Sequence, residues 1–164
     1  MTGLRIGQGF DAHRFSAGRE LRLCGVSIPG EVGLEGHSDA DVGLHAVTDA
    51  VFGALARGDL GEHFPSSDLE WKDSGSAVFL ARALEMAAAD GYRLVNCDLT
   101  LIGERPQIAP LRDRLRGSLA KILGVDTNVV SVKATTTEGM GFAGRSEGLA
   151  ALAVVLLEER VADE

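Results

Sequence analysis

The chain has 164 residues, of which 45% are hydrophobic, and a formal charge of −8. This length and composition suit one compact domain with an ordinary core, so we expect a single domain at 1–164. The composition excludes a general nucleic-acid surface, which would need clustered lysine and arginine. The net charge also opposes an anionic ligand, and a phosphate-binding site would therefore need a bound divalent cation to supply positive charge.

The sequence predicts a soluble, cytoplasmic protein. Its longest apolar stretch, 149–157, is too short to span a bilayer, and residues 1–5 are not followed by a signal-type apolar run. Cys24 and Cys97 form no CxxC pair, so neither a disulfide framework nor a thiolate zinc site is indicated. We expect both cysteines to be reduced, inert packing residues.

The first elements along the chain are predicted to be strands followed by a helix. Residues 4–10 form a short apolar run that predicts a strand, and 21–23 and 26–28 resemble two further short strands. Apolar residues with a 3.6-residue period then predict a helix over 42–55, with Ser38 or Asp39 as N-cap and Gly58 at its end. On this helix Asp41, His45 and Asp49 stand in one row, because they are four residues apart.

The second half of the chain continues this alternation. The polar segment 59–73 predicts an ordered or closable loop. Helices are predicted over 76–90 and 111–123, and strands over 93–103 and 129–137. The last segment, 149–158, suits a buried strand by its unbroken apolar run and a helix by its alanine and leucine content, and we favour the strand.

A metal site is indicated at the end of the first predicted strand. Asp11 and His13 alternate along it, so both side chains lie on one face about 7 Å apart, a span that one metal ion can bridge. His45, on the polar row of the first helix, is the best candidate for a third ligand. Such a ligand set leaves a tetrahedral zinc with one open position, as in catalytic sites, and imidazole nitrogens favour zinc over magnesium. The alternative is that these histidines are packed or solvent-bonded.

The segment 7–12, GQGFDA, also matches the dinucleotide fingerprint GxGxxA. That fingerprint needs a helix directly after it. Gly18 follows soon after Ala12, and no amphipathic period begins between them. We therefore reject a dinucleotide site here.

With these pieces in place, the chain resembles the 2-C-methyl-D-erythritol 2,4-cyclodiphosphate synthases over nearly its whole length. The resemblance rests on RIGQGFDAHRF, HSDADVGLHAVTDAVFGA, GDLGEHFPSSD, VKATTTEGMGFAGRSEGLA and the strand before ERP. It implies that Asp11, His13 and His45 hold zinc. It also implies isoprenoid biosynthesis: the 2-phosphate of 4-diphosphocytidyl-2-C-methyl-D-erythritol 2-phosphate attacks its own β-phosphate, and CMP leaves.

The resemblance implies roles for further residues. Glu138 would hold a second divalent ion, magnesium or manganese, while His37 and Thr136 would stabilise the transition state through hydrogen bonds. Without the resemblance, His37 could equally be an ordinary loop histidine and Thr136 a threonine suited to a strand. The residues implied to bind substrate are Asp11, His13, His37, Ser38, Asp59, Leu60, Gly61, Phe64, Pro65, Ser66, Ser67, Asp68, Gly103, Glu104, Arg105, Pro106, Gln107, Ile108, Ala109, Thr135, Thr136, Thr137, Glu138, Phe142 and Arg145.

Within this set, 59–61 would bind the methylerythritol part, 64–68 would form a loop over the substrate, and 103–109 would cradle cytosine with backbone groups. Taken by themselves, the first two segments read as a solvated turn. The sequence departs from the family pattern at Gln107, where a lysine is common, and this change bears on recognition of the base.

The implied fold is α/β (α+β), with a mixed four-stranded sheet covered by helices on one face. Family members are homotrimers whose sheets face a central axis, with active sites between neighbours, and this would explain the apolar run at 149–157. Arg145 and Glu147 match a charged pair at one end of the central cavity, where isoprenoid diphosphates could bind. Two rival functions are a metal-dependent phosphohydrolase and a nucleotide- or isoprenoid-binding regulatory module with a structural metal.

Overall fold

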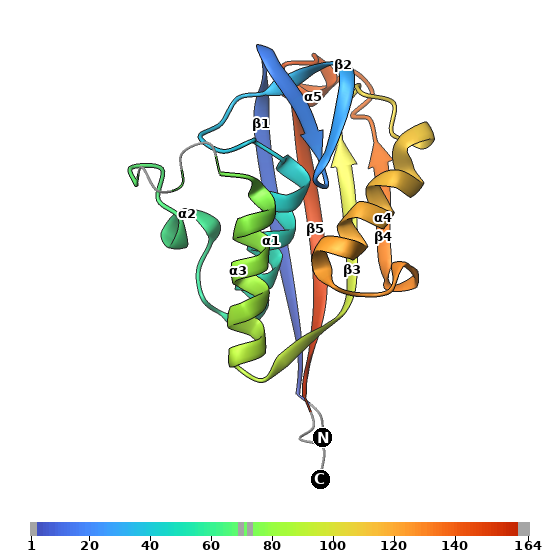
Figure 1. The fold of residues 1–164 in the computed structure, drawn as a ribbon. Coiled ribbons are helices and arrows are strands. Elements are labelled where there is room, and N and C mark those ends of the chain that lie inside the picture. Colours follow the sequence, from blue (N-terminus) through green and yellow to red (C-terminus); the bar gives the residue numbers. More distant parts are fainter. Residues whose placement is uncertain (1–2, 69–70, 72–73, 161–164) are drawn as a thin grey trace.

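A computed structural model describes residues 3–68, 71 and 74–160. Within these residues a five-stranded mixed sheet has the order β2-β1-β5-β3-β4, and α1, α3 and α4 cover one of its faces (Figure 1). The expectation of four strands was wrong by one. The strands are β1 (Leu4–Leu23), β2 (Val26–Leu34), β3 (Tyr92–Ile102), β4 (Val130–Thr135) and β5 (Gly148–Glu159), and the helices are α1 (Val42–Leu55), α2 (Leu60–His63), α3 (Ser76–Ala89), α4 (Arg112–Leu123) and α5 (Gly141–Gly144).

Strand β1 is the longest element, and it differs most from the sequence-based prediction. The predicted strands at 4–10 and 21–23 are one continuous strand of 20 residues. Its first half pairs with β5, from Leu4 to Arg14, and its second half pairs with β2. The polar composition of 11–20 hid this continuity. Backbone pairing, with β5 up to Arg14 and with β2 from Phe15, sustains the strand where side-chain burial does not.

Helix α1 lies unusually close to β1, and two glycines make this approach possible. A Cβ added to Gly7 would lie 1.8 Å from the carbonyl oxygen of Ala50, and one added to Gly9 would lie 1.9 Å from that of Ala46. Only glycine lets the two backbones come this near. The GxG pattern therefore serves helix–strand packing, and the rejection of a dinucleotide fingerprint is confirmed because β1, not a helix, continues after Ala12.

The N-cap of α1 is Asp41 rather than Ser38 or Asp39. The buried Asp41 carboxylate accepts hydrogen bonds from the backbone N–H groups of Leu44 (3.1 Å), Cys24 (2.9 Å) and Gly25 (2.6 Å), so it joins the β1–β2 turn to the start of α1. Burial raises the pKa of Asp41, although these donors oppose the rise. The helix ends at Leu55, where Ala56 adopts a left-handed conformation, and not at Gly58.

Most of the other predicted elements are confirmed to within two residues, but the strand predicted at 26–28 continues to Leu34 because its pairing with β1 extends that far. Strand β5 resolves the ambiguity of the last segment, and it lies between β1 and β3, where its apolar run is paired along both edges. The free thiols of Cys24 and Cys97 are buried in the core, as expected, and burial raises the pKa of Cys97 to about 12. None of the described helices is both long enough and apolar enough to cross a membrane.

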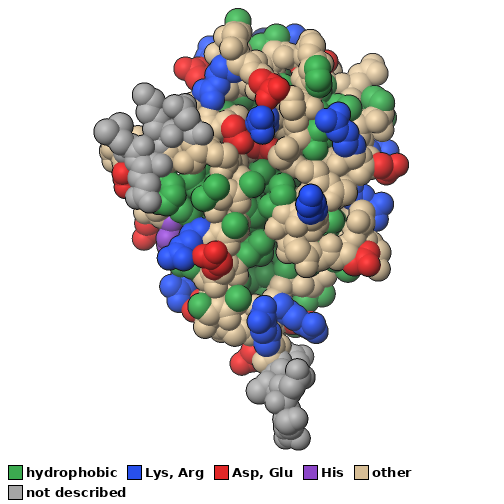
Figure 2. All heavy atoms as spheres, viewed as in Figure 1, with side chains coloured by type: hydrophobic (Ala, Val, Ile, Leu, Met, Phe, Trp, Pro, Cys, Tyr) green, Lys and Arg blue, Asp and Glu red, His purple; other side chains and the backbone are tan. Residues whose placement is uncertain are grey.

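The two faces of β1 have opposite character. Gly7, Gly9, Asp11 and His13 alternate along the face that meets α1. Between them, Leu4, Ile6 and Phe10 point to the other face, with 61%, 72% and 56% of their surface exposed. On the helix-covered side, Figure 2 shows acidic and basic side chains interspersed over the surface. The sheet thus carries exposed apolar side chains on the face away from its helices.

Candidate metal centre and substrate pocket

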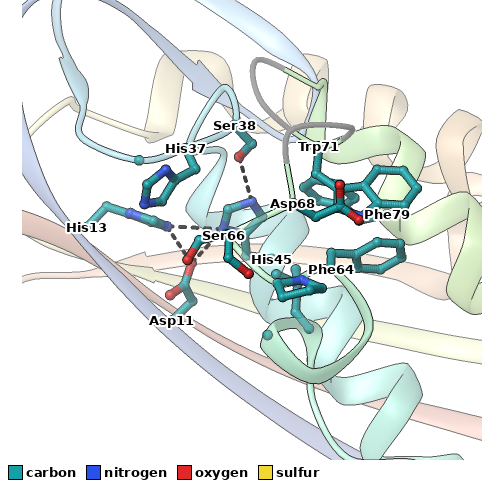
Figure 3. A pocket seen from close by; sticks show the side chains of 15 residues that line it. Asp11, His13, His37, Ser38, His45, Phe64, Ser66, Asp68, Trp71 and Phe79 are labelled. Carbon is teal, nitrogen blue, oxygen red and sulfur yellow. Dashed lines mark hydrogen bonds and ion pairs between the residues drawn. The ribbon is translucent and has the colours of Figure 1, made fainter.

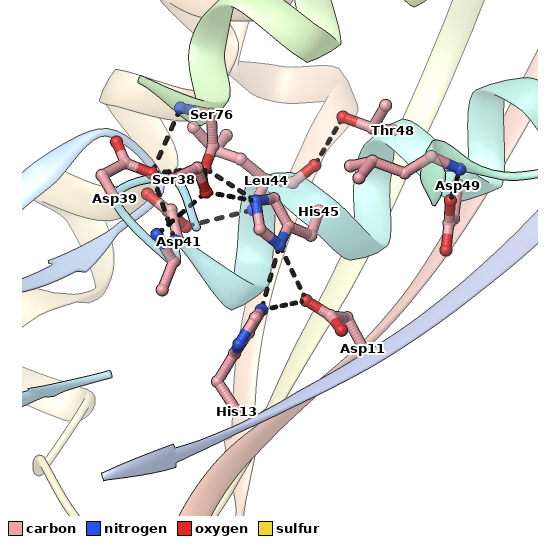
Figure 4. A network of polar contacts seen from close by, with 12 residues as sticks. Asp11, His13, Ser38, Asp39, Asp41, Leu44, His45, Thr48, Asp49 and Ser76 are labelled. Atoms are coloured by element: carbon pink, nitrogen blue, oxygen red, sulfur yellow. Dashed lines mark hydrogen bonds and ion pairs between the residues drawn. The ribbon is translucent and has the colours of Figure 1, made fainter. Parts of the chain in front are cut away.

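The three predicted metal ligands converge in the structure. Asp11 and His13 follow the two packing glycines on the same face of β1, and His45 comes from the first turn of α1. Asp11 Oδ2 lies 2.8 Å from His13 Nε2 and 3.0 Å from His45 Nδ1, and these two nitrogens are 3.0 Å apart (Figures 3 and 4). Close packing of α1 against β1 therefore brings together side chains more than 30 residues apart in the sequence.

The hydrogen bonds of His13 show which of its nitrogens faces a metal as a lone pair. His13 Nδ1 lies 2.7 Å from the carbonyl oxygen of Glu35, which can only accept, so Nδ1 carries a hydrogen and the neutral ring presents Nε2 as a lone pair. His45 directs Nδ1 to the same point and turns Nε2 toward the hydroxyls of Ser38 and Ser76. In neutral rings, these nitrogens and the Asp11 carboxylate oxygen face one another as lone pairs, and they repel unless a positive charge lies between them. A proton can supply that charge through hydrogen bonds to Asp11, and a divalent metal can replace the proton, so this donor set fits such a metal.

The electrostatics of the cluster support an ionised carboxylate. Burial by itself would raise the pKa of Asp11, but hydrogen bonds and charge interactions with His13 and His45 outweigh it and hold the pKa well below its usual range. For His13, burial favours the neutral ring, and the hydrogen bond and charge of Asp11 reverse this effect and raise the pKa. Asp11 is therefore an anionic ligand at neutral pH.

The cluster opens into a cavity of about 390 Å³ (Figure 3). Aromatic rings form one wall, where Phe64 and Phe79 lie 4.6 Å apart between centroids and Trp71 packs edge-on against Phe64. The cavity is lined by Asp11, His13, Gly36, His37, Ser38, His45, Leu60, Gly61, Phe64, Pro65, Ser66, Ser67, Asp68, Trp71 and Phe79. Metal ligands and apolar walls in one cavity suit a small molecule that carries both phosphate and hydrocarbon.

The residues at 37–38, 60–61 and 64–68 that were predicted to bind substrate line this cavity, and their role stays a prediction. Asp59 is not among the residues that line the cavity, and its carboxylate caps α2 by accepting from Glu62 N at 2.9 Å. Asp49 accepts from Leu60 N at 2.7 Å and so ties this loop to α1. The predicted loop 59–73 contains the short helix α2, and residues 69, 70, 72 and 73 lie outside the described part of the chain.

The sequence did not identify Trp71, Phe79 and Ser76 as parts of the site. Trp71 is the only tryptophan of the chain, which was a usable signal. Phe79 and Ser76 lie in α3, where an apolar residue and a serine are ordinary, so their place beside His45 follows only from the packing of α3 on α1.

A second group of predicted residues gathers elsewhere. Residues 103–109 and 135–138 follow the adjacent ends of the parallel strands β3 and β4, and Gly103 N donates to the carbonyl oxygen of Thr135 at 3.0 Å. Thr136 Oγ1 donates to Glu138 Oε1 at 3.2 Å. None of these residues lines the metal-site cavity of the described chain. Strands β5 and β3 separate β4 from β1, so one chain holds the two groups apart.

Arg145 and Glu147 form an exposed ion pair, with Nε and Oε1 2.7 Å apart. Phe142 and Glu147 line a smaller cavity with Ala12, His13 and Arg14. Of the described residues, only His13 lines both this cavity and the metal-site cavity, so the two cavities are distinct.

Comparison with known proteins identifies relatives along the same stretch. The sequence model of the YgbB family matches residues 4–158. A 2-C-methyl-D-erythritol 2,4-cyclodiphosphate synthase from Cereibacter sphaeroides is 55% identical over 154 residues, which cover 94% of this chain and 97% of the relative.

Solved structures share the fold. The bifunctional IspDF from Campylobacter jejuni has a TM-score of 0.92 and 38% identity, covering 97% of this chain and 43% of that protein. The CDP complex of IspF from Plasmodium falciparum has a TM-score of 0.86 and 31% identity, covering 98% and 99% of the two chains. Fold and sequence therefore lead to the same set of proteins.

Proposed function

Because this chain belongs to the YgbB family, we propose that it is a cyclodiphosphate synthase, a lyase-type enzyme of isoprenoid biosynthesis. Its relatives include 2-C-methyl-D-erythritol 2,4-cyclodiphosphate synthases. It would convert 4-diphosphocytidyl-2-C-methyl-D-erythritol 2-phosphate to 2-C-methyl-D-erythritol 2,4-cyclodiphosphate and CMP. An oxygen of the 2-phosphate forms a bond to the β-phosphorus. The bond from that phosphorus to the CMP oxygen breaks, and no water is consumed.

The observation that carries the proposal is the convergence of Asp11, His13 and His45 at the mouth of a partly apolar cavity. A phosphate nucleophile and a phosphate electrophile repel each other until positive charge neutralises and aligns them. Zinc held by these ligands would supply that charge and act as a Lewis acid on a phosphate oxygen. Three protein ligands would leave such a metal free to contact a phosphate oxygen of the substrate.

The remaining roles belong to residues on either side of the reacting phosphates. His37, whose ring faces the cavity, and Thr136 would donate hydrogen bonds to the transition state. Glu138 would hold magnesium or manganese beside the diphosphate. The backbone of 103–109 would bind the cytosine. The CDP complex of the Plasmodium falciparum relative supports a cytidine-linked ligand.

A complete site then requires more than one copy of the chain. His37 lies with the metal group, while Thr136 and Glu138 lie beyond two further strands. The exposed apolar side chains of Leu4, Ile6 and Phe10 offer a surface that a neighbouring copy could cover. We infer a homotrimer in which the metal group of one copy faces the Thr136–Glu138 group of its neighbour, with Arg145 and Glu147 available to isoprenoid diphosphates near the central axis.

The deciding experiment follows the products of the purified, zinc-loaded protein supplied with magnesium and the cytidyl substrate. Stoichiometric CMP and cyclic diphosphate support cyclisation. A phosphohydrolase with the same ligands would instead use a metal-bound hydroxide, and release of inorganic phosphate without a cyclic product would overturn the proposal.

The regulatory-module alternative is tested with His45→Ala. A structural metal predicts that this variant either unfolds or keeps its function. A catalytic metal predicts a folded assembly that has lost zinc and turnover, and thermal melting beside a CMP-release assay separates these outcomes.

A further inference from the structure

Behind His45 lies a buried chain of hydrogen bonds that the proposed reaction does not use directly (Figure 4). His45 Nε2, the nitrogen turned away from the metal-binding point, lies 2.9 Å from Ser76 Oγ and 3.1 Å from Ser38 Oγ. Ser76 Oγ in turn donates to Asp39 Oδ1 in a short hydrogen bond. Ser76 is fully buried, and Ser38 and His45 are 5% and 8% exposed, so little water can compete for these contacts.

The donors and acceptors of this chain fit only one direction of hydrogen bonding. The Asp39 carboxylate can only accept, so the single hydrogen of the Ser76 hydroxyl points to Asp39. Ser76 Oγ is then left as an acceptor for His45, whose Nε2 must carry the hydrogen. With Nε2 protonated, the neutral ring presents an unprotonated Nδ1 to Asp11 and His13, as a metal ligand requires.

We propose that Asp39 and Ser76 are positioning residues that hold His45 in its metal-binding tautomer and ring orientation. They act on His45 through its Nε2 atom, the ring nitrogen that faces away from the metal-binding point, and they would not contact the metal themselves. The inference rests on the proposed metal site and names residues that set its affinity. It parallels the position of His13, whose ring is held from behind by the Glu35 carbonyl.

The same carboxylate connects the metal site to the beginning of α3. Gly75, the N-cap of α3, has no side chain, and Asp39 Oδ1 takes over the capping by accepting from Ser76 N at 3.1 Å. Asp39 N also donates to the carbonyl oxygen of Ser74 at 3.3 Å. Correct placement of α3 and correct orientation of His45 therefore depend on one aspartate.

Ser38 is a secondary acceptor in this arrangement. Its Oγ accepts from Ala40 N at 3.1 Å and lies 3.4 Å from Ser76 Oγ, so it is held in place and can share the hydrogen of His45. Removing Ser76 alone therefore leaves His45 one acceptor, which limits the expected loss.

The test measures zinc affinity of the assembled protein by competition with a chromogenic chelator. Loss of such outer partners usually weakens metal binding about 10- to 100-fold, and the remaining Ser38 places Ser76→Ala near the lower end, at about tenfold. Asp39→Ala is expected to weaken zinc binding to a similar extent. Because Asp39 acts through Ser76, the double variant should bind zinc no more than about twofold more weakly than Ser76→Ala.

Two further variants distinguish loss of the Asp39–Ser76–His45 hydrogen bonds from a general loss of stability. Asp126→Ala removes another capping aspartate, which accepts from Asn128 N far from His45, and it should lower the melting temperature without changing zinc affinity. Asp39→Asn keeps an oxygen to cap α3, so it serves if Ser76→Ala does not fold, and its weaker acceptor should lower zinc affinity severalfold.

Zinc affinity within twofold of wild type in both Ser76→Ala and Asp39→Asn would overturn the proposal that Asp39 and Ser76 position His45. Fully additive losses of zinc affinity in the double variant Asp39→Ala/Ser76→Ala would also overturn it. These results leave the proposed function standing, since wild type still binds zinc. Failure of the wild-type protein to bind zinc at all would instead reject the metal site itself.

Discussion

The metal group around His45 and the group around Thr136 and Glu138 differ in how completely one chain builds them. In the first, both histidines have a fixed partner: His13 is held by Glu35, and His45 by Ser38 and Ser76. In the second, Glu138 has a positive φ of 52°, is exposed, and bonds only to its neighbour Thr136 in the described contacts. One half of the proposed site is therefore prearranged within the fold, whereas the other half would be completed by the neighbouring copy and the ligand of the proposed homotrimer.

The largest effect on turnover is expected from a change in the metal group. His45→Ala should lower CMP release by about 10³-fold or more, because several kcal/mol of transition-state stabilisation depend on the metal. Metal analysis should find zinc lost and the melting profile should retain one cooperative transition. Turnover close to wild type in this variant would contradict the role of the metal.

A smaller loss of turnover is expected from a change in the group around Thr136 and Glu138. Glu138→Gln removes the charge that would hold the second cation but keeps the shape of the side chain, so turnover should fall about 10- to 100-fold, and excess magnesium should recover part of it. Zinc content should stay at the wild-type level, since Glu138 is not a zinc ligand. Full turnover across limiting magnesium would remove this role from Glu138.

Trimers that contain both variants test whether the metal group of one copy meets the Thr136–Glu138 group of another. In a mixed trimer, one interface joins the intact His45 of one copy to the intact Glu138 of the next. Co-expression of His45→Ala and Glu138→Gln chains should therefore restore about a quarter of wild-type turnover. If each chain carried its own complete site, the mixture would be no more active than its better component.

The smallest effect concerns the approach of α1 to β1, which places His45 beside Asp11. Gly9→Ala introduces a Cβ 1.9 Å from the Ala46 carbonyl oxygen and should lower the free energy of unfolding by about 1–3 kcal/mol in urea titrations. Gly117→Ala is the matched control, because its Cβ would meet nothing within 4 Å in α4. That change should stabilise the protein by about 0.5–1 kcal/mol, because alanine restricts the unfolded chain. Equal responses of the two variants would reject the close-packing argument.

The sequence by itself determined the types of most elements and indicated the three candidate metal ligands. Strand alternation places Asp11 and His13 on one face, and helical periodicity places His45 on the polar row of α1. These patterns are local, and their consequences survive in any packing that forms the same strand and helix. For the same reason the helices at 76–89 and 112–123 were predicted nearly to their ends.

Only the tertiary structure decided the features that depend on distant partners. It extended β1 to 20 residues through pairing with β2, and it made Asp41 the cap of α1 because that carboxylate also satisfies the β1–β2 turn. It brought Ser76 of α3 behind His45 and kept Glu138 apart from the metal group. Hydrogen bonds between segments far apart in the chain leave no periodic trace in the sequence, because they depend on how helices and strands pack rather than on local propensity.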